Sequence, residues 1–347
     1  MKREPLRIGE LTAKIPVIQG GMGVGVSLSG LAGAVAACGG VGVLSAAQIG
    51  YQNPLFEKNP LAANIKAIKE EIGKARAAAR GGVLGINIMV ATKSYARYVK
   101  ASVEEGIDLI ISGAGLPVSL PELVKGSNVK IAPIVSTAKA ASVICRLWDR
   151  NDKRVPDLVI IEGPEAGGHL GFTKSQLKEY TPEVYREEIR KILAVIRQYR
   201  EKYARPIPVA IAGGIYDRKD MDQALSLGAD AVQMGTRFVT TYECDASMAY
   251  KKAYLDCGIE DILITDSPVG MPGRAVANKF LREKKKTEGR CYQCLERCDP
   301  SKIPYCITKA LISAVQGDVD EGLIFCGANA WRADKLEHVA DILQELS

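Results

Sequence analysis

The stretch Val159-Ile-Ile-Glu-Gly-Pro-Glu-Ala-Gly-Gly-His169 joins a short apolar run to a charged, glycine-rich turn that ends in a histidine. Such a run is typical of a buried parallel strand, and barrels of parallel strands carry their functional groups at the carboxyl ends. Gly167 and Gly168 lack a Cβ, so a flat or phosphorylated ligand can approach the backbone closely there. The stretch therefore predicts a buried strand whose following loop opens to a ligand.

Apolar runs of the same kind recur along the chain, with amphipathic segments between them. The expected strands are residues 15–18, 41–45, 83–89, 109–115, 130–135, 158–161, 208–215 and 231–238. The expected helices are residues 31–37, 61–79, 94–105, 138–148, 182–203 and 219–227. Eight strands that alternate with helices predict an α/β fold of the (β/α)8 TIM barrel type. A doubly wound sheet is the alternative, but no G-x-G-x-x-G follows the first strand.

The alternation stops after Phe238. Residues 241–314 are charged and are expected to be helical and rich in loops, and an amphipathic helix is expected at 333–346. We therefore predict a barrel formed by residues 1–240 and 315–347, with residues 241–314 inserted as a lid.

Composition favours a cytoplasmic enzyme that binds neither nucleic acid nor membrane. The 347 residues carry a net charge of +6, without the interleaved aromatic and basic residues that nucleic-acid binding requires. The uncharged stretch between Lys14 and Glu57 is rich in glycine, which favours a buried strand–helix–strand unit over a membrane span. No signal peptide is recognised at the N-terminus, and nine cysteines are expected to be free thiols in a reducing compartment.

Two glycine-containing turns predict a phosphate site. They follow the seventh and eighth strands, and the loops after these strands commonly hold phosphate in TIM barrels. The residues expected there are Gly213, Gly214, Gln233, Met234, Gly235 and Thr236. Backbone N–H groups beside glycine and the Thr236 hydroxyl would bind the anion. The alternative is that these glycines serve only the tight turns.

Three polar residues are expected at the open end of the barrel. Asn87 lies near the end of the third expected strand, where a buried amide without a partner would cost about 1–3 kcal/mol, so it must bind backbone, water or a ligand. Glu162 lies where a strand side chain would reach a polyol. His169 is a candidate base, because an ordinary imidazole pKa near 6.5 suits proton abstraction at neutral pH. A structural, hydrogen-bonded histidine is the alternative.

Four of the nine cysteines lie close together in the sequence, and we call them the cysteine cluster: Cys291, Cys294, Cys298 and Cys306. Their spacing matches neither a paired zinc ribbon nor a ferredoxin run. We therefore expect thiols of the lid without a metal. Zinc, an iron–sulfur cluster and a transient disulfide remain open.

Several motifs together resemble the nitronate monooxygenase (2-nitropropane dioxygenase-like) family. They are Ile15-Pro-Val-Ile-Gln-Gly-Gly-Met22, Gly85-Ile-Asn-Ile-Met89, Glu162-Gly-Pro-Glu-Ala-Gly-Gly-His169, Ala212-Gly-Gly-Ile215, Gln233-Met-Gly-Thr-Arg-Phe238 and Ser267-Pro-Val-Gly-Met-Pro-Gly-Arg274. The resemblance implies an FMN-containing TIM barrel. Gly21, Met22 and Gly23 would line the isoalloxazine, Asn87 and Glu162 would contact the flavin, and Gly167 and Gly168 would pass beside it.

The same resemblance implies the reaction. The expected activity is oxidation of alkyl nitronates with O2, with His169 as the base or substrate contact. The alternative is an NAD(P)H-dependent enoyl-ACP reductase of the FabK type or a quinone reductase, which would act on an enoyl thioester or a quinone. A third hypothesis is a non-catalytic flavin- or metal-binding protein whose cysteine cluster is the working part. A homodimer is left open.

Overall fold

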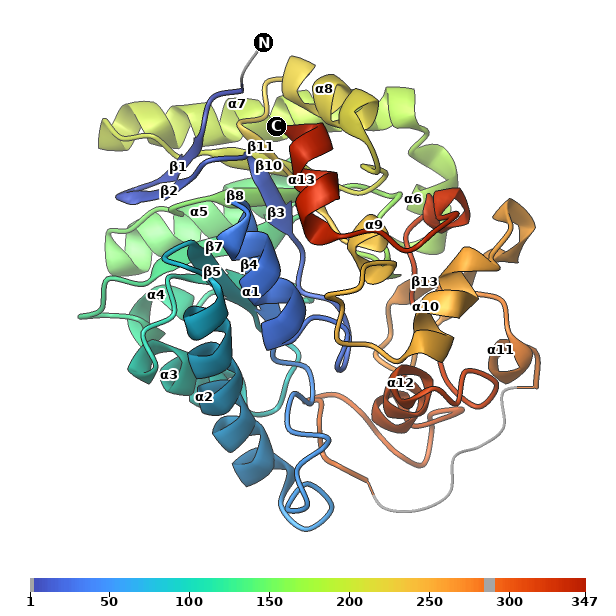
Figure 1. Ribbon diagram of the computed structural model, residues 1–347. Coiled ribbons are helices and arrows are strands. Elements are labelled where there is room, and N and C mark those ends of the chain that lie inside the picture. The colour runs from blue at the N-terminus through green and yellow to red at the C-terminus, as the bar shows by residue number, and fades with distance from the viewer. Residues whose placement is uncertain (1–2, 284–290) are drawn as a thin grey trace.

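The computed structural model describes residues 3–283 and 291–347 of the chain (Figure 1). Eight parallel strands form a closed barrel in the order β10-β11-β3-β4-β5-β6-β7-β8. Their bounds are β3 Val17–Gln19, β4 Val41–Ser45, β5 Val83–Asn87, β6 Leu109–Ser112, β7 Lys130–Val135, β8 Val159–Glu162, β10 Val209–Ala212 and β11 Ala231–Met234. Pairing of β11 with β3 and of β10 with β8 closes the ring. The predicted TIM barrel is confirmed.

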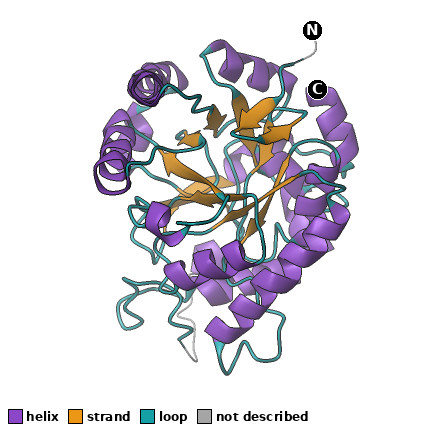
Figure 2. Ribbon diagram, turned by 90° about the vertical axis from the view of Figure 1, so that its left-hand side faces the viewer, coloured by secondary structure: helices purple, strands orange, loops and turns teal. Residues whose placement is uncertain are grey.

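Helices surround the barrel on its outer face (Figure 2). They are α1 Ser29–Ala37, α2 Pro60–Ala78, α3 Tyr95–Glu104, α4 Leu120–Leu123, α5 Ala138–Asp152, α7 Pro182–Tyr203, α8 Arg218–Ser226 and α13 Val339–Leu346. Each longer helix buries one apolar stripe against the strands, which excludes water from both. Ile189, Ile192 and Ile196 form that stripe on α7. The spacing of apolar residues had predicted these helices within a few residues, except α4 and the last one.

Two helix caps show how far local sequence decides an end. Asp217 caps α8 and forms a capping box with Asp220, three residues further along the chain. Ser27 and Ser29 are residues of a type that often caps helices, but neither side chain caps α1. The carboxylate of Asp245 accepts hydrogen bonds from the N–H groups of Leu28 and Leu31 instead. A residue more than 200 positions away thus satisfies the first turn of α1.

A short hairpin covers the amino end of the barrel. Strands β1 (Leu6–Ile8) and β2 (Leu11–Ala13) pair antiparallel. Leu6 and Ile8 are buried in the cluster that fills the barrel interior. The hairpin was not expected from the sequence, because two strands of three residues carry too little periodicity to recognise.

The chain after β11 contains a sheet that the sequence analysis missed. The elements there are α9 Thr236–Val239, α10 Met248–Leu255, β12 Ile262–Asp266, β13 Pro272–Val276, α11 Lys279–Glu283 and α12 Ile307–Gln316. Strands β12 and β13 form a hairpin, and β13 also pairs with β9 (Gly168–His169). Residues 241–314 are therefore not only helix and loop. The hairpin lies beside the carboxyl ends of the barrel strands, because β9 directly follows β8.

Several element ends also differ from expectation: the strands expected at 83–89, 109–115 and 208–215 end at Asn87, Ser112 and Ala212. The last helix begins at Val339 instead of residue 333, since a short 3-10 turn at Ala330–Arg332 precedes it. The eighth strand ends at Met234, and the chain then enters α9. Among the described residues, none of the helices is long and apolar enough to cross a membrane.

Candidate functional site

A cavity of about 1580 Å³ opens at the carboxyl ends of the barrel strands. Barrel loops form one side of it, and residues from the segment 241–314 form the other. All residues named as site candidates from the sequence line this one cavity: Gly21, Met22, Gly23, Asn87, Glu162, Gly167, Gly168, His169, Gly213, Gly214, Gln233, Met234, Gly235 and Thr236. Residues from five strand ends thus converge as the barrel topology requires.

Asn87 contains a polar atom that nothing in the described protein satisfies. Its side-chain Oδ1 is buried and has no hydrogen-bond partner among the described residues. Gly21 packs directly on this side chain, because a Cβ built on Gly21 would lie 2.5 Å from the Cβ of Asn87. The barrel therefore holds the amide rigidly at the cavity wall, where a ligand donor would relieve the cost of the unpaired oxygen.

Glu162 brings a carboxyl group into the same wall from the end of β8. Burial raises the pKa of Glu162 from 4.5 to about 7. Near neutral pH a large share of this group is therefore protonated, and it can donate a hydrogen bond as well as accept one. Tyr185 fixes the backbone at this point, since its hydroxyl donates to the carbonyl oxygens of Glu162 and Ser136, each at 3.0 Å.

His169 lies in β9 and is held by residues from two later parts of the chain. Its Nε2 lies 2.7 Å from the Ser267 Oγ, and its ring packs edge-on against Phe325 with 4.9 Å between centroids. Burial lowers the pKa of His169 to about 4. The sequence analysis used the ordinary value near 6.5; in the folded protein the imidazole is neutral throughout the physiological range.

The loop that contains Gly167 and Gly168 is held in place by a residue from outside the barrel. Arg274 of β13 donates to the carbonyl oxygens of Pro164, at 2.9 Å, and Ala166. A Cβ at Gly167 would lie 2.7 Å from the backbone of Cys326, so this glycine makes room for another chain segment rather than for a ligand. At Gly168, with φ +72°, a Cβ would meet no atom within 4 Å. Gly168 therefore satisfies the expected open approach, whereas the glycine before it serves packing.

The two turns expected to bind phosphate lie side by side after β10 and β11. Gly213 and Gly214 have φ of +94° and +76°, a backbone that glycine adopts most readily. The Asn329 amide donates to the Gly214 carbonyl at 2.7 Å, and the N–H of Gly327 donates to the Thr236 hydroxyl at 3.1 Å. In this hydrogen bond the Thr236 hydroxyl is the acceptor, so its own proton is not used by Gly327.

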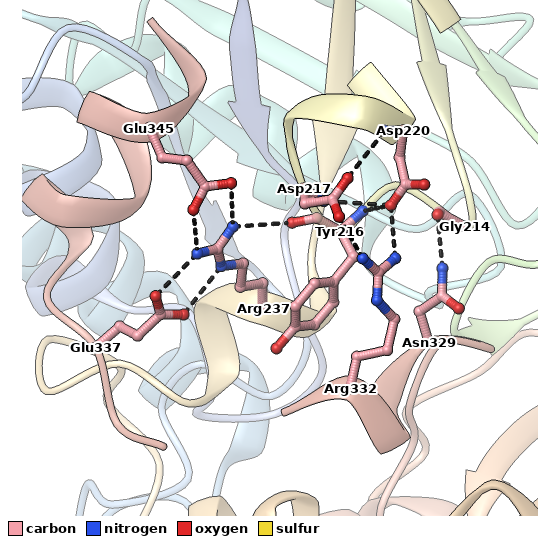
Figure 3. Close-up of polar contacts among 9 residues, drawn as sticks. All are labelled: Gly214, Tyr216, Asp217, Asp220, Arg237, Asn329, Arg332, Glu337 and Glu345. Atoms are coloured by element: carbon pink, nitrogen blue, oxygen red, sulfur yellow. Dashed lines mark hydrogen bonds and ion pairs between the residues drawn. The ribbon is translucent and has the colours of Figure 1, made fainter. Parts of the chain in front are cut away.

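Two arginines and a tyrosine anchor these turns to the end of the chain (Figure 3). Arg237 makes paired hydrogen bonds of 2.8–2.9 Å with Glu337, and it also binds Glu345. Arg332 binds Asp217 and Asp220 at the start of α8. The Tyr216 ring lies between both guanidinium groups, at 5.4 and 4.6 Å from its centroid. These ion pairs fix the loop that follows Gly214.

Sequence reasoning assigned no role to several residues of this site. Ser267, Arg274, Phe325 and Asn329 act on the expected residues from distant segments. Two of them stand in Ser267-Pro-Val-Gly-Met-Pro-Gly-Arg274, which was quoted as a motif, and the other two in Phe325-Cys-Gly-Ala-Asn329. The signal available in the sequence was the concentration of glycine and polar residues in these stretches. The sequence did not indicate which atoms these residues contact.

The cysteine cluster lies within residues 241–314, part of which line the cavity. All nine cysteines are free thiols. Within the part of the chain that the structure describes, no group of three or more His, Cys, Asp or Glu side chains is arranged to hold a metal ion. Cys298 lines the main cavity. Burial raises the pKa of Cys294 to about 11, so this thiol stays protonated.

Comparison with known proteins gives consistent matches over nearly the whole chain. The family model described as nitronate monooxygenase matches residues 4–347. A probable nitronate monooxygenase of Staphylococcus saprophyticus is 27% identical over 305 residues, which cover 82% of this chain and 81% of that protein. The structure of FabK from Thermotoga maritima superimposes with a TM-score of 0.71 and 26% identity, covering 96% of this chain and 92% of FabK.

A third similar protein is named for a different activity. The (3aS,4S,5R,7aS)-5-hydroxy-7a-methyl-1-oxo-octahydro-1H-indene-4-carboxyl-CoA dehydrogenase of Mycobacterium tuberculosis is 27% identical over 268 residues. These cover 77% of this chain and 64% of that enzyme. Oxidation of nitronates is thus one of at least two activities among the similar proteins.

Proposed function

Because the chain belongs to the nitronate monooxygenase family of flavin-dependent oxidoreductases, we propose that it binds FMN in the main cavity and oxidises alkyl nitronates with O2. The observation that carries the cofactor assignment is the buried Oδ1 of Asn87, which lacks a protein partner. A donor on the flavin ring or ribityl chain would satisfy it.

The rest of the cavity fits the parts of FMN. Gly21, Met22 and Gly23 would line the isoalloxazine, and a carboxyl group with a pKa near 7 at Glu162 can donate to or accept from a polyol. Adjacent turns would take the phosphate through Gly213, Gly214, Gln233, Met234, Gly235 and Thr236.

FMN, when bound, would supply the redox chemistry, while the chain binds and orients the substrate. We assign His169 the role of base toward neutral nitroalkanes. The support for this role is the position of the neutral imidazole at the cavity wall, since burial lowers the pKa of His169 and by itself weakens it as a base. The contacts with Ser267 and Phe325 fix the ring orientation. An anionic nitronate needs no proton removal, so the base would matter only for the neutral form.

We further propose that residues 241–314 form a lid over a barrel built from residues 1–240 and 315–347. Support comes from the pairing of β13 with β9 and from side chains of Ser267, Met271 and Leu295 at the cavity wall. Such a cover would exclude water from the substrate.

An NAD(P)H-dependent reductase of enoyl thioesters or quinones is the second candidate. The cavity volume favours it, because about 1580 Å³ exceeds the 300–1,000 Å³ of usual ligand pockets and leaves room beside FMN for a larger substrate. The relatives include FabK and a dehydrogenase whose name contains a CoA thioester.

One anaerobic titration separates the two candidates. Oxidised, FMN-loaded protein is mixed with ethylnitronate and, separately, with NADH and NADPH, and flavin absorbance near 450 nm is followed. We expect rapid bleaching by the nitronate without nicotinamide. Rapid bleaching by NADH or NADPH and none by the nitronate would establish the reductase. A colourless protein that does not take up added FMN would refute both.

A further inference from the structure

A second cavity, of about 650 Å³, lies outside the main site and is lined by basic residues. Three segments form it: the chain that enters α2, the start of α3 and residues 291–293. Its described lining consists of Lys58, Asn59, Pro60, Leu61, Lys93, Ser94, Ala96, Arg97, Cys291, Tyr292 and Gln293. No role for it follows from the flavin site.

The electrostatics of this second cavity favour an anion. Lys93 and Arg97 contribute two cationic groups, and no acidic residue is found among its described lining residues. Lys93 donates to the neutral amide oxygen of Gln293 at 3.0 Å. Across residues 3–283 and 291–347, neither Lys93 nor Arg97 has a carboxylate within 4.0 Å. The positive charge of these two side chains is therefore not neutralised by a direct ion pair.

Two helix starts add to this positive potential. Helices α2 and α3 both begin at the second cavity, and neither has an acidic residue in its first turn. Ser94 precedes α3 without making a side-chain cap hydrogen bond. Backbone N–H groups at a helix start carry partial positive charge, which adds to that of the nearby side chains. The nearest acid in sequence, Glu57, accepts a hydrogen bond from the Tyr292 hydroxyl at 2.8 Å.

The volume of the second cavity and an aromatic ring in its wall indicate which class of anion fits, namely a nucleoside phosphate. A volume of about 650 Å³ lies within the usual range for small-molecule sites and exceeds the needs of bare phosphate. Tyr292 lines the second cavity, and its ring is fixed by packing on Phe56 with 5.1 Å between centroids. An aromatic face beside cationic groups suits a base joined to a phosphate, because bases stack on aromatic rings.

A thin wall separates the two cavities. Thr92 and Leu295 form a β-bridge, and the N–H of Lys93 donates to the Cys294 carbonyl at 3.1 Å. Leu295 lines the main cavity, whereas Lys93 lines the second. We propose that the second cavity, on the outer side of this wall, binds a nucleoside phosphate; this statement does not rest on the proposed function.

Isothermal titration calorimetry of ADP into the FMN-loaded full chain tests the site. We expect ADP to bind, and R97E and K93E each to weaken binding at least tenfold. Lys100 is exposed on the same helix but outside the second cavity, so K100E is the matched control and should bind within twofold of wild type. R97Q is included, because loss of the positive charge alone should also weaken the binding of ADP. Circular dichroism checks that each variant is folded.

Several further measurements decide whether the second cavity binds a nucleoside phosphate. Inorganic phosphate and adenosine should each bind far more weakly than ADP, and 0.5 M NaCl should weaken ADP binding. Coenzyme A and NADPH are titrated next, and binding of either that weakens in R97E shows which larger nucleotide the second cavity accepts. No heat with ADP, phosphate binding as tight as ADP, or equal losses in K100E and R97E would overturn the proposal. The heat of ADP binding does not depend on turnover, so this result stands apart from the nitronate titration.

Discussion

Replacing Glu162 by Gln should remove a pH-dependent loss of stability that burial of this carboxyl causes in the flavin-free protein. Burial raises the pKa of Glu162 from 4.5 to about 7, so the folded protein keeps a proton that the unfolded chain releases. The stability due to that proton is fully present below pH 4.5 and is lost as the pH rises through 7. At 1.36 kcal/mol for each pKa unit, the loss is about 3 kcal/mol.

Urea unfolding followed by circular dichroism at pH 4.5 and pH 8 measures the effect. The difference in unfolding free energy between E162Q and wild type should grow by about 3 kcal/mol between these pH values, because all other titrating groups cancel. Glu201, which is exposed on α7, provides the control: E201Q should follow wild type at both pH values. A difference between E162Q and wild type that stays constant within about 0.5 kcal/mol would show that the carboxyl is not buried as the structure has it.

Three further substitutions test other parts of the site. H169N should retain FMN but lower turnover of neutral nitroalkanes far more than that of nitronates, and equal losses would refute the base role. G21A should weaken FMN binding and destabilise the fold by about 1–3 kcal/mol, measured by flavin fluorescence and urea unfolding, since the new Cβ would lie 2.5 Å from Asn87. R237M should cost about 3 kcal/mol in unfolding free energy, because it leaves the nearly buried Glu337 without its cation; a loss under about 1 kcal/mol would contradict that reasoning.

Local sequence determined the barrel. Short apolar runs such as 130–135 must be buried on both faces, and helices such as 182–203 have one apolar stripe, so their alternation leaves few architectures open. Because parallel strands all present their carboxyl ends at one face, the sequence also predicted that Asn87, Glu162 and His169 would meet. Their convergence on one cavity follows from topology alone.

Only the tertiary structure decided the contacts and pKa values that depend on residues distant in the sequence. The sequence gives no sign that Asp245 caps α1, that Ser267 meets His169, or that β13 pairs with β9, because such contacts join segments about 100 to 200 residues apart. The pKa of an imidazole follows its surroundings, so the ordinary value near 6.5 assumed for His169 gives way to about 4 once these segments bury the ring. Periodicity and composition are local properties, whereas desolvation and hydrogen bonding are set by the folded neighbourhood.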